Sequence, residues 1–225
     1  MSNFSNDAHL LKWEPDVFRL CRFPQQKLAA GATGATTAAS TTFTDTTSGD
    51  FVSANVTTGH VIHLSKSGVY DDYVPVLSRA NATQLVLDAP RGIFSAQSSV
   101  AWSIYTFDPQ HEEAHFELLE RFDINDENPD NADEEDLFDV RVLRRASVFR
   151  VLEMIFRAQA TSENDLFWQK AVRYRTLYER ALAAVRVRFD FNADGRVDET
   201  RDARSVELRV EESGDAWPTD EPEAT

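Results

Sequence analysis

Large apolar residues recur at intervals of three and four in two neighbouring segments, around 138–156 and 163–186. This spacing is typical of amphipathic α-helices, because residues three and four apart lie on one helix face. The second apolar stripe covers nearly half of its helix, which is more than one neighbouring helix would cover. We therefore predict a packed helical pair whose second member also contacts another element or another copy of the chain. The stripes consist of Phe138, Val142, Ala146, Phe149, Leu152 and Phe156 in the first helix, and of Leu166, Phe167, Tyr174, Leu177, Tyr178, Leu182 and Val185 in the second.

The same helices concentrate positive charge in a chain that is acidic as a whole. Residues 141–188 contain eleven Lys and Arg against four Asp and Glu, a balance of +7, whereas the other residues contain 12 bases and 34 acids, a balance of −22. Residues 108–139 alone hold 14 acids and one base. A basic helical surface of this kind favours contact with something acidic: nucleic acid, another protein, or the acidic segment of a second copy.

Arginines supply nearly all of this charge, since the chain has 23 basic residues and only four are Lys. Arg forms planar bidentate pairs at interfaces better than Lys does, although a GC-rich coding genome would give the same bias. Arg145 falls inside the apolar stripe, where a lone buried guanidinium is costly. It is expected to pair with a carboxylate, to lie at a subunit contact, or to extend its charge past the edge of the stripe. The candidate interface residues are Arg141, Arg144, Arg145, Arg173 and Arg175.

Composition excludes several classes of protein. No apolar run approaches the roughly 18 residues that a membrane helix needs, so we expect no membrane segment. A single cysteine, Cys21, excludes an internal disulfide and fits a reducing compartment. The net charge of −15 disfavours sequence-independent wrapping of DNA, because phosphate repels such a surface. It leaves open a ring that confines DNA in its central hole without gripping it.

Residues 50–107 show short, alternating, β-branched segments with turn residues between them, which predicts four or five strands and a small barrel. A helix is expected to begin at Pro109, and a strand at 205–210. We therefore predict an α+β fold: a helical bundle with a small β-barrel insertion and a C-terminal β-strand segment. The expected units are an N-terminal arm and Ala/Thr-rich linker (1–49), a small β-barrel (50–107), a helical bundle (108–190), an acidic turn and strand (191–210), and a flexible acidic tail (211–225).

An acidic turn after the second helix follows part of a calcium-loop pattern. Asp190, Asn192, Asp194 and Asp198 match the ligand positions 1, 3, 5 and 9 of such a loop, with a glycine at position 6. Position 12, where calcium loops carry a bidentate Glu, is Arg201. The sequence thus predicts either a weak Ca²⁺ site or a turn whose side chains hold its own backbone.

One short motif suggests catalysis. His111, Glu112 and His115 satisfy H-E-x-x-H, in which two imidazoles on one helix face bind zinc and the Glu acts as base. Here the motif stands in the first turn after Pro109, Glu113 adds a charge, and no third ligand follows. A zinc metallopeptidase and a calcium-dependent binding module are the alternatives to a protein without enzymatic activity.

The order of these segments resembles that of tailed-bacteriophage head-to-tail adaptor (connector, head completion) proteins. The resemblance rests on the 51–64 segment with the strands at 73–76 and 83–87, on 143–152 and 174–182 in the helices, and on the Asp-x-Asn-x-Asp-Gly turn. It implies a homo-oligomeric ring, usually of twelve subunits, docked beneath the portal protein and above the tail terminator or other neck proteins. It implies no catalysis.

The expected function is therefore that of a structural virion protein which joins the portal to the tail and lines the DNA exit channel. DNA would pass through the ring without sequence recognition. The protein would be found in the virion neck, and in the host cytoplasm during assembly. In the ring, the acidic 108–139 segment of one copy is expected to meet the basic helices of another.

Overall fold

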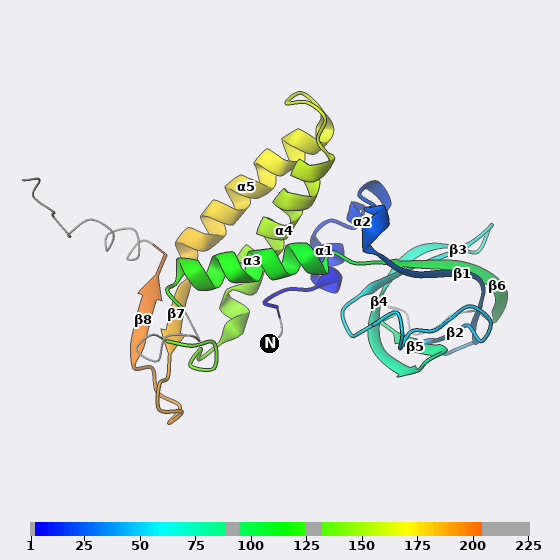
Figure 1. Ribbon diagram of the computed structural model, residues 1–225, viewed down its shortest axis with the longest axis horizontal. Helices are drawn as coiled ribbons and strands as arrows, with labels where there is room; N and C mark the ends of the chain where they lie inside the picture. The colour runs from blue at the N-terminus through cyan, green and yellow to red at the C-terminus, as the bar shows by residue number, and fades with distance from the viewer. Residues whose placement is uncertain (1–2, 89–94, 125–131, 204–225) are drawn as a thin grey trace, which may run out of the picture.

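The computed structural model of the chain describes residues 3–88, 95–124 and 132–203. A β-barrel lies at one end of the molecule and a group of helices at the other (Figure 1). Helix α3 (Asp108–Arg121) follows the last barrel strand. It runs toward the hairpin of β7 (Arg186–Phe189) and β8 (Glu199–Asp202) at the far end (Figure 1). The short helices α1 (Asp7–Trp13) and α2 (Val17–Leu20) lie between the two parts. Within the described segments, no helix combines the length and the apolar character needed to cross a membrane.

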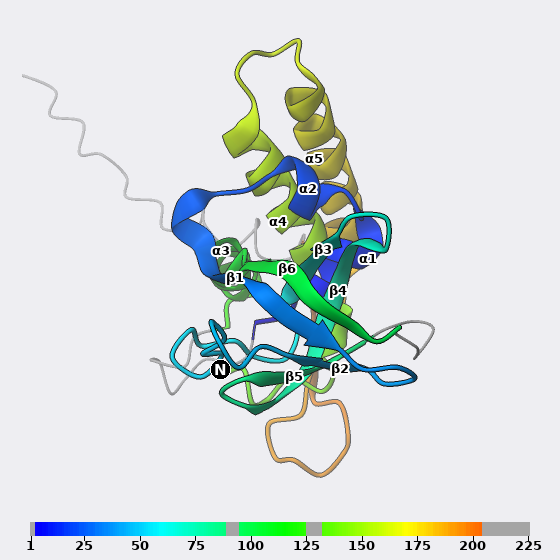
Figure 2. The same ribbon diagram turned by 90° about the vertical axis from the view of Figure 1, so that its right-hand side faces the viewer.

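Six antiparallel strands form a closed barrel in the order β1-β2-β5-β4-β3-β6. The barrel faces the viewer in Figure 2. Closure occurs where β1 pairs with β6, with Gly31 opposite Trp102. Alternate side chains point inward and fill the interior, as expected for a small barrel. The strands are β1 (Lys27–Thr36), β2 (Thr42–Thr44), β3 (Val61–Lys66), β4 (Tyr70–Asn81), β5 (Gln84–Leu87) and β6 (Gln97–Tyr105). The largest buried interior residues are Phe43, Phe51, Ile62, Leu64, Leu85, Leu87 and Trp102.

The prediction of a helical bundle with a small barrel insertion is wrong. The fold is mixed α+β, but the closed six-stranded barrel is a major part of it, and β1 and β2 come from the segment predicted to be a linker. Glycines explain the difference. A Cβ added at Gly31 would lie 2.7 Å from Nε1 of Trp102, and one at Gly34 would lie 2.4 Å from Cζ of Phe43. The small residues of β1 therefore admit large aromatic side chains rather than provide loop flexibility.

A single carboxylate ties the barrel wall together. Asp45, which follows β2, is 1% exposed and accepts hydrogen bonds from Trp102 Nε1 (2.6 Å), Ser48 Oγ (2.7 Å) and Thr33 Oγ1 (2.9 Å). The backbone amides of Thr47 and Ser48 also donate to it. Burial by itself raises the pKa of Asp45, but these donors outweigh burial and hold the pKa well below its ordinary value. The carboxylate thus stays ionised while it joins β1, β2 and β6.

The helical part confirms the predicted packed pair. Helices α4 (Arg144–Gln159) and α5 (Leu166–Ala184) lie side by side, and α3 packs on α4. The predicted stripe of α4 is buried at Ala146, Phe149, Leu152 and Phe156, whereas Phe138 precedes the helix and is 43% exposed. Helix α5 keeps unburied apolar surface, since Leu166 is 58% and Val172 49% exposed. The short elements are η1 (Pro24–Gln26), η2 (Val140–Val142), β7 (Arg186–Phe189) and β8 (Glu199–Asp202).

The C-terminal strand predicted at 205–210 lies outside the described residues. The described strand pairing near that end is the antiparallel hairpin of β7 and β8, with Val187 opposite Arg201. The acidic turn therefore connects two strands rather than a helix and a strand. Residues 125–131 of the acidic loop and the 211–225 tail are likewise outside the described part of the chain.

The N-terminal arm joins the barrel to the helices. The Asp7 side chain is fully buried, and its Oδ1 accepts a hydrogen bond from the Phe107 backbone amide, at the point where β6 gives way to α3. The Ala8 amide donates to the Gly59 carbonyl oxygen beside the barrel (2.8 Å). Phe4 packs against His115 of α3 with 4.3 Å between ring centroids. One short segment thus contacts the barrel, the β6–α3 junction and α3.

Replacing Asp45 by Asn should destabilise the protein by about 2–3 kcal/mol, because an amide cannot accept from all five donors and presents hydrogens to some of them. The wild type should lose stability as pH falls from about 4 toward the depressed folded pKa, since a carboxyl whose pKa is lowered by folding stabilises only while it is ionised. Thermal unfolding of both proteins at pH 7 and pH 3 measures the difference. Asp72→Asn, an exposed carboxyl on β4, is the matched control, and an equal loss in both variants would contradict the assigned role of Asp45.

Candidate functional site

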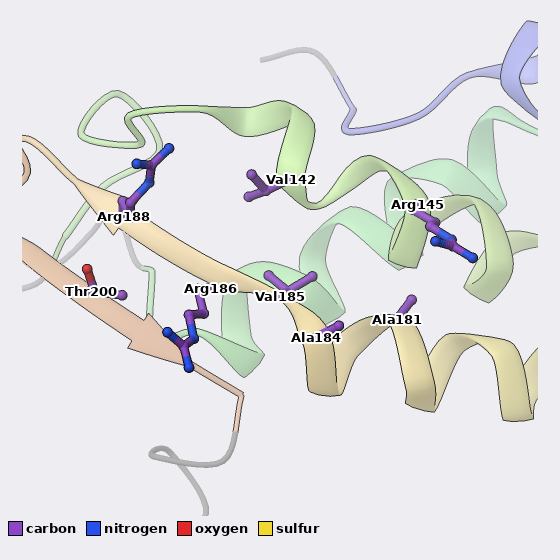
Figure 3. Close-up of a pocket in the computed structure, with 8 residues that line it drawn as sticks. All are labelled: Val142, Arg145, Ala181, Ala184, Val185, Arg186, Arg188 and Thr200. Carbon is purple, nitrogen blue, oxygen red and sulfur yellow. The ribbon is translucent and has the colours of Figure 1, made fainter.

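A groove of about 600 Å³ lies where the C-terminal end of α5 meets β7, β8 and the start of α4 (Figure 3). Its apolar wall comes from Val142 and from three residues at the end of α5 and just after it. Three arginines and a threonine complete the lining, and Figure 3 shows their side chains around the apolar residues. The lining residues are Val142, Arg145, Ala181, Ala184, Val185, Arg186, Arg188 and Thr200.

Two of the three groove arginines stand on one face of a strand. In β7, Arg186 and Arg188 are exposed. The residues that alternate with them, Val187 and Phe189, are buried, which is the period-two pattern of a strand with one solvent-exposed face. Arg188 lies over the ring of Phe138, with 5.0 Å from its Cζ to the ring centroid. Among the ion pairs of the described residues, none involves Arg145, Arg186 or Arg188. The groove therefore offers three guanidinium groups around an apolar surface.

Arg145 is the one candidate interface residue that lines this groove. It is exposed, and its guanidinium lies over the rings of Trp13 and Phe149, 5.4 Å from each centroid. Such cation–π contacts let the charge reach solvent while the side chain covers aromatic surface. Arg145 thus avoids the cost expected for a buried lone guanidinium without a carboxylate partner in the described chain.

The other four candidate arginines are spread over the helical part. Arg141 pairs with Asp139 at the surface (3.1 Å), and hydrogen bonds from Arg141 lower the pKa of that carboxyl. Arg175 pairs with Glu179 one turn along α5 (3.2 Å), and Arg173 is exposed on the same helix. Arg144 is half-buried, with an Nε that has no hydrogen-bond partner among the described residues. The structure does not bring these four together with Arg145 in one site.

Sequence reasoning missed Arg186 and Arg188, which contribute more to the groove than four of the five arginines selected. The available signal was the alternation Arg-Val-Arg-Phe at 186–189, which places both arginines on one side of a strand. Both arginines fall within the basic region predicted to be helical, and helix periodicity would not place positions 186 and 188 on one face.

The side chains of the acidic turn accept hydrogen bonds from the backbone amides of the same turn. Asp190 accepts hydrogen bonds from the amides of Asp194 (3.1 Å) and Gly195 (2.8 Å), and Asp194 accepts from the Arg196 amide (2.8 Å). Asn192 and Asp198 also accept backbone amides, those of Asp194 and Phe191. These bonds are the ones expected of the structural alternative. Bound Ca²⁺ stays a prediction of the sequence pattern.

Arg201, at the position where a calcium loop needs its bidentate Glu, has a structural role. Its Nη1 donates to the carbonyl oxygens of Phe122 (3.1 Å) and Asp123 (2.8 Å) beyond the end of α3, and its Cζ lies 4.7 Å from the ring centroid of Phe189. This side chain fixes the β7–β8 hairpin, and with it one wall of the groove, against α3.

The residues of the H-E-x-x-H motif face different partners. His111 is fully buried, its Nδ1 is hydrogen-bonded with Ser5 Oγ (2.8 Å), and its Nε2 lies 3.3 Å from Asp7 Oδ1. His115 lies 3.3 Å from Glu134 through its Nε2. Glu112 is exposed. The two imidazoles and the Glu therefore do not gather around one position, and the geometry does not support the metallopeptidase alternative.

A different group has metal-like spacing: Asp7, His60 and Asp108 present ligand atoms within 4.8 Å of one another. Asp108 Oδ2 lies 2.9 Å from Nε2 of His60. The Nδ1 of His60 accepts a hydrogen bond from the Thr57 backbone amide (3.1 Å), so the hydrogen of the neutral ring is on Nε2 and points to Asp108. A metal would need the Nε2 lone pair and would force Nδ1–H against that amide. The arrangement of Asp7, His60 and Asp108 therefore fits a hydrogen-bonded contact between the barrel and the helices better than a metal site.

The chain matches no protein-family model, no curated protein and no solved structure.

Replacing Asp7 by Ala should cost roughly 2–4 kcal/mol, because it removes a buried acceptor and leaves the Phe107 amide without its partner. Chelation with EDTA should leave the melting temperature of the wild type unchanged, since the group is held by hydrogen bonds. Urea unfolding followed by circular dichroism measures the first effect, with Asp72→Ala at an exposed carboxyl as control. A chelator-induced drop in melting temperature would instead identify a metal.

For the acidic turn, we expect calcium at about 1 mM to raise the melting temperature slightly and Asp194→Ala to abolish that rise, since cations at incomplete loops bind weakly. Magnesium at the same ionic strength is the control for charge screening. If neither protein responds specifically to calcium, the turn is purely structural.

Proposed function

We propose that this protein is a structural adaptor in the virion neck of a tailed phage. Twelve copies of it form a ring between the portal protein and the tail or terminator proteins. DNA passes through the central channel without sequence recognition. Two independent lines support the proposal: the resemblance of the ordered segments at 51–87, 143–182 and 190–195 to head-to-tail adaptors, and a surface suited to docking.

The observation that carries the proposal is the groove of Arg145, Arg186 and Arg188 around an apolar wall. Interfaces combine an apolar centre with charged groups at the rim, and Arg is enriched in them. The chain outside 141–188 is strongly acidic, so a second copy or an acidic partner complements this groove electrostatically. A ring uses such complementarity in every subunit contact.

Further apolar surface is available on the helical part. Leu166 and Val172 of α5 are about half exposed, as are Phe116 on α3 and Phe138 before α4. Single exposed apolar residues are common on soluble proteins, but here they accompany a helix whose apolar stripe is wider than one neighbour requires. In the proposed ring this excess faces the adjacent subunit.

Mixing the purified protein with the portal protein of the same phage should produce rings that native mass spectrometry and negative-stain electron microscopy detect. Arg186→Glu should weaken this association on the order of tenfold at low salt, because it reverses a charge at the contact. Arg19→Glu on α2 makes the same charge change at an exposed position away from the groove and should have little effect. A protein that never associates with the portal at low or moderate salt would exclude the adaptor function.

A further inference from the structure

The groove needs an occupant with two properties. Its three arginines call for carboxylates, which guanidinium groups bind in planar bidentate pairs. Its apolar wall of Val142, Ala181, Ala184 and Val185 calls for a large apolar side chain. Arg145 already lies over the Trp13 ring, so this guanidinium is oriented by aromatic contact within the chain itself. A short acidic segment with an aromatic residue would satisfy both requirements.

The chain carries one such segment outside the described residues. Positions 211–225 hold six acids, no base and a single Trp. Trp217 stands between Asp215 and Asp220, so one side chain for the apolar wall has carboxylates on both sides for the arginines.

The attachment point favours binding within the same molecule. The described chain ends at Ala203, directly after β8, and Thr200 of β8 lines the groove. Trp217 is fourteen residues beyond Ala203, a length that spans up to about 46 Å when extended. A tethered segment this close to its site has an effective concentration on the order of millimolar, well above that of a free partner in solution.

We propose that the acidic C-terminal segment of this chain binds in the groove of the same molecule, with Trp217 against the apolar wall and its flanking carboxylates on Arg145, Arg186 and Arg188. The groove of the free subunit is then covered, and a partner must displace the segment to use it. This second statement rests on the proposed adaptor function, and it gives the free subunit a reason to stay unassembled until the portal template is present.

Disulfide trapping in the full-length protein tests the contact. The only native cysteine, Cys21, is fully buried, so an added pair of cysteines reacts without competition. Ala184→Cys in the groove is combined with Ala216→Cys in the tail, and Ala183→Cys with Ala216→Cys is the matched control. Ala183 and Ala184 are both exposed neighbours at the end of α5, but only Ala184 lines the groove.

Non-reducing gels should show a monomeric cross-linked band that forms on the order of tenfold faster for the groove pair than for the control pair, as expected when binding raises the local concentration. Adding 1 M salt or the Trp217→Ala change should slow it to the control rate, because each removes one of the two attractions. Equal rates for the two pairs would overturn the proposal. A cross-linked dimer in place of the monomer would also overturn it, by assigning the groove to the tail of a second copy.

Portal binding by the groove-pair variant separates the contact from its consequence. The reduced form should bind the portal and the cross-linked form should bind at least about tenfold more weakly, since the tether then blocks displacement. Equal binding of both forms would exclude the regulatory role. Failure of both forms and of the wild type to bind the portal would instead exclude the adaptor function and leave the intramolecular contact as measured.

Discussion

The position of the barrel relative to the helices depends on the buried carboxylate of Asp7. This side chain accepts the Phe107 amide at the junction of β6 and α3, lies against His111, and belongs to the same group as His60 of the barrel and Asp108. The groups around this side chain belong to the barrel, to the β6–α3 junction and to α3, so three separate parts of the chain meet at Asp7. Without Asp7 the contact between the N-terminal arm and the β6–α3 junction would be weaker, because the Phe107 amide would lose its acceptor.

How far the fold can be predicted from sequence differs between its two halves. The α4–α5 pair was predictable because helix periodicity is local and strong, and Ala146, Phe149, Leu152 and Phe156 are buried as that periodicity requires. The extent of the barrel was not, because β1 pairs with a strand about seventy residues away and its glycines resemble those of a linker. Only the partner side chains, Trp102 and Phe43, show why residues without bulk stand there.

The candidate site shows the same limit. Charge concentration in the helical region pointed to a basic surface, yet the groove draws two of its three arginines from a strand that follows the helices. Arg145 stands in an apolar stripe, and two aromatic rings rather than a carboxylate accommodate its guanidinium. The basic and apolar residue types of the groove could thus be predicted from the sequence. That α4, α5, β7 and β8 meet at one groove could be seen only in the three-dimensional structure.

The pairing of β1 with β6, together with the arm that precedes β1, has a consequence for synthesis on the ribosome. The barrel cannot close until Tyr105, the last residue of β6, has left the exit tunnel, and Ser5 cannot reach its partner Ser147 until most of the chain has been made. The N-terminal segment therefore lacks its native contacts during much of translation. The exposed aromatic residues of the nascent arm, Phe4 and Trp13 among them, are the expected binding sites for ribosome-associated chaperones during that interval.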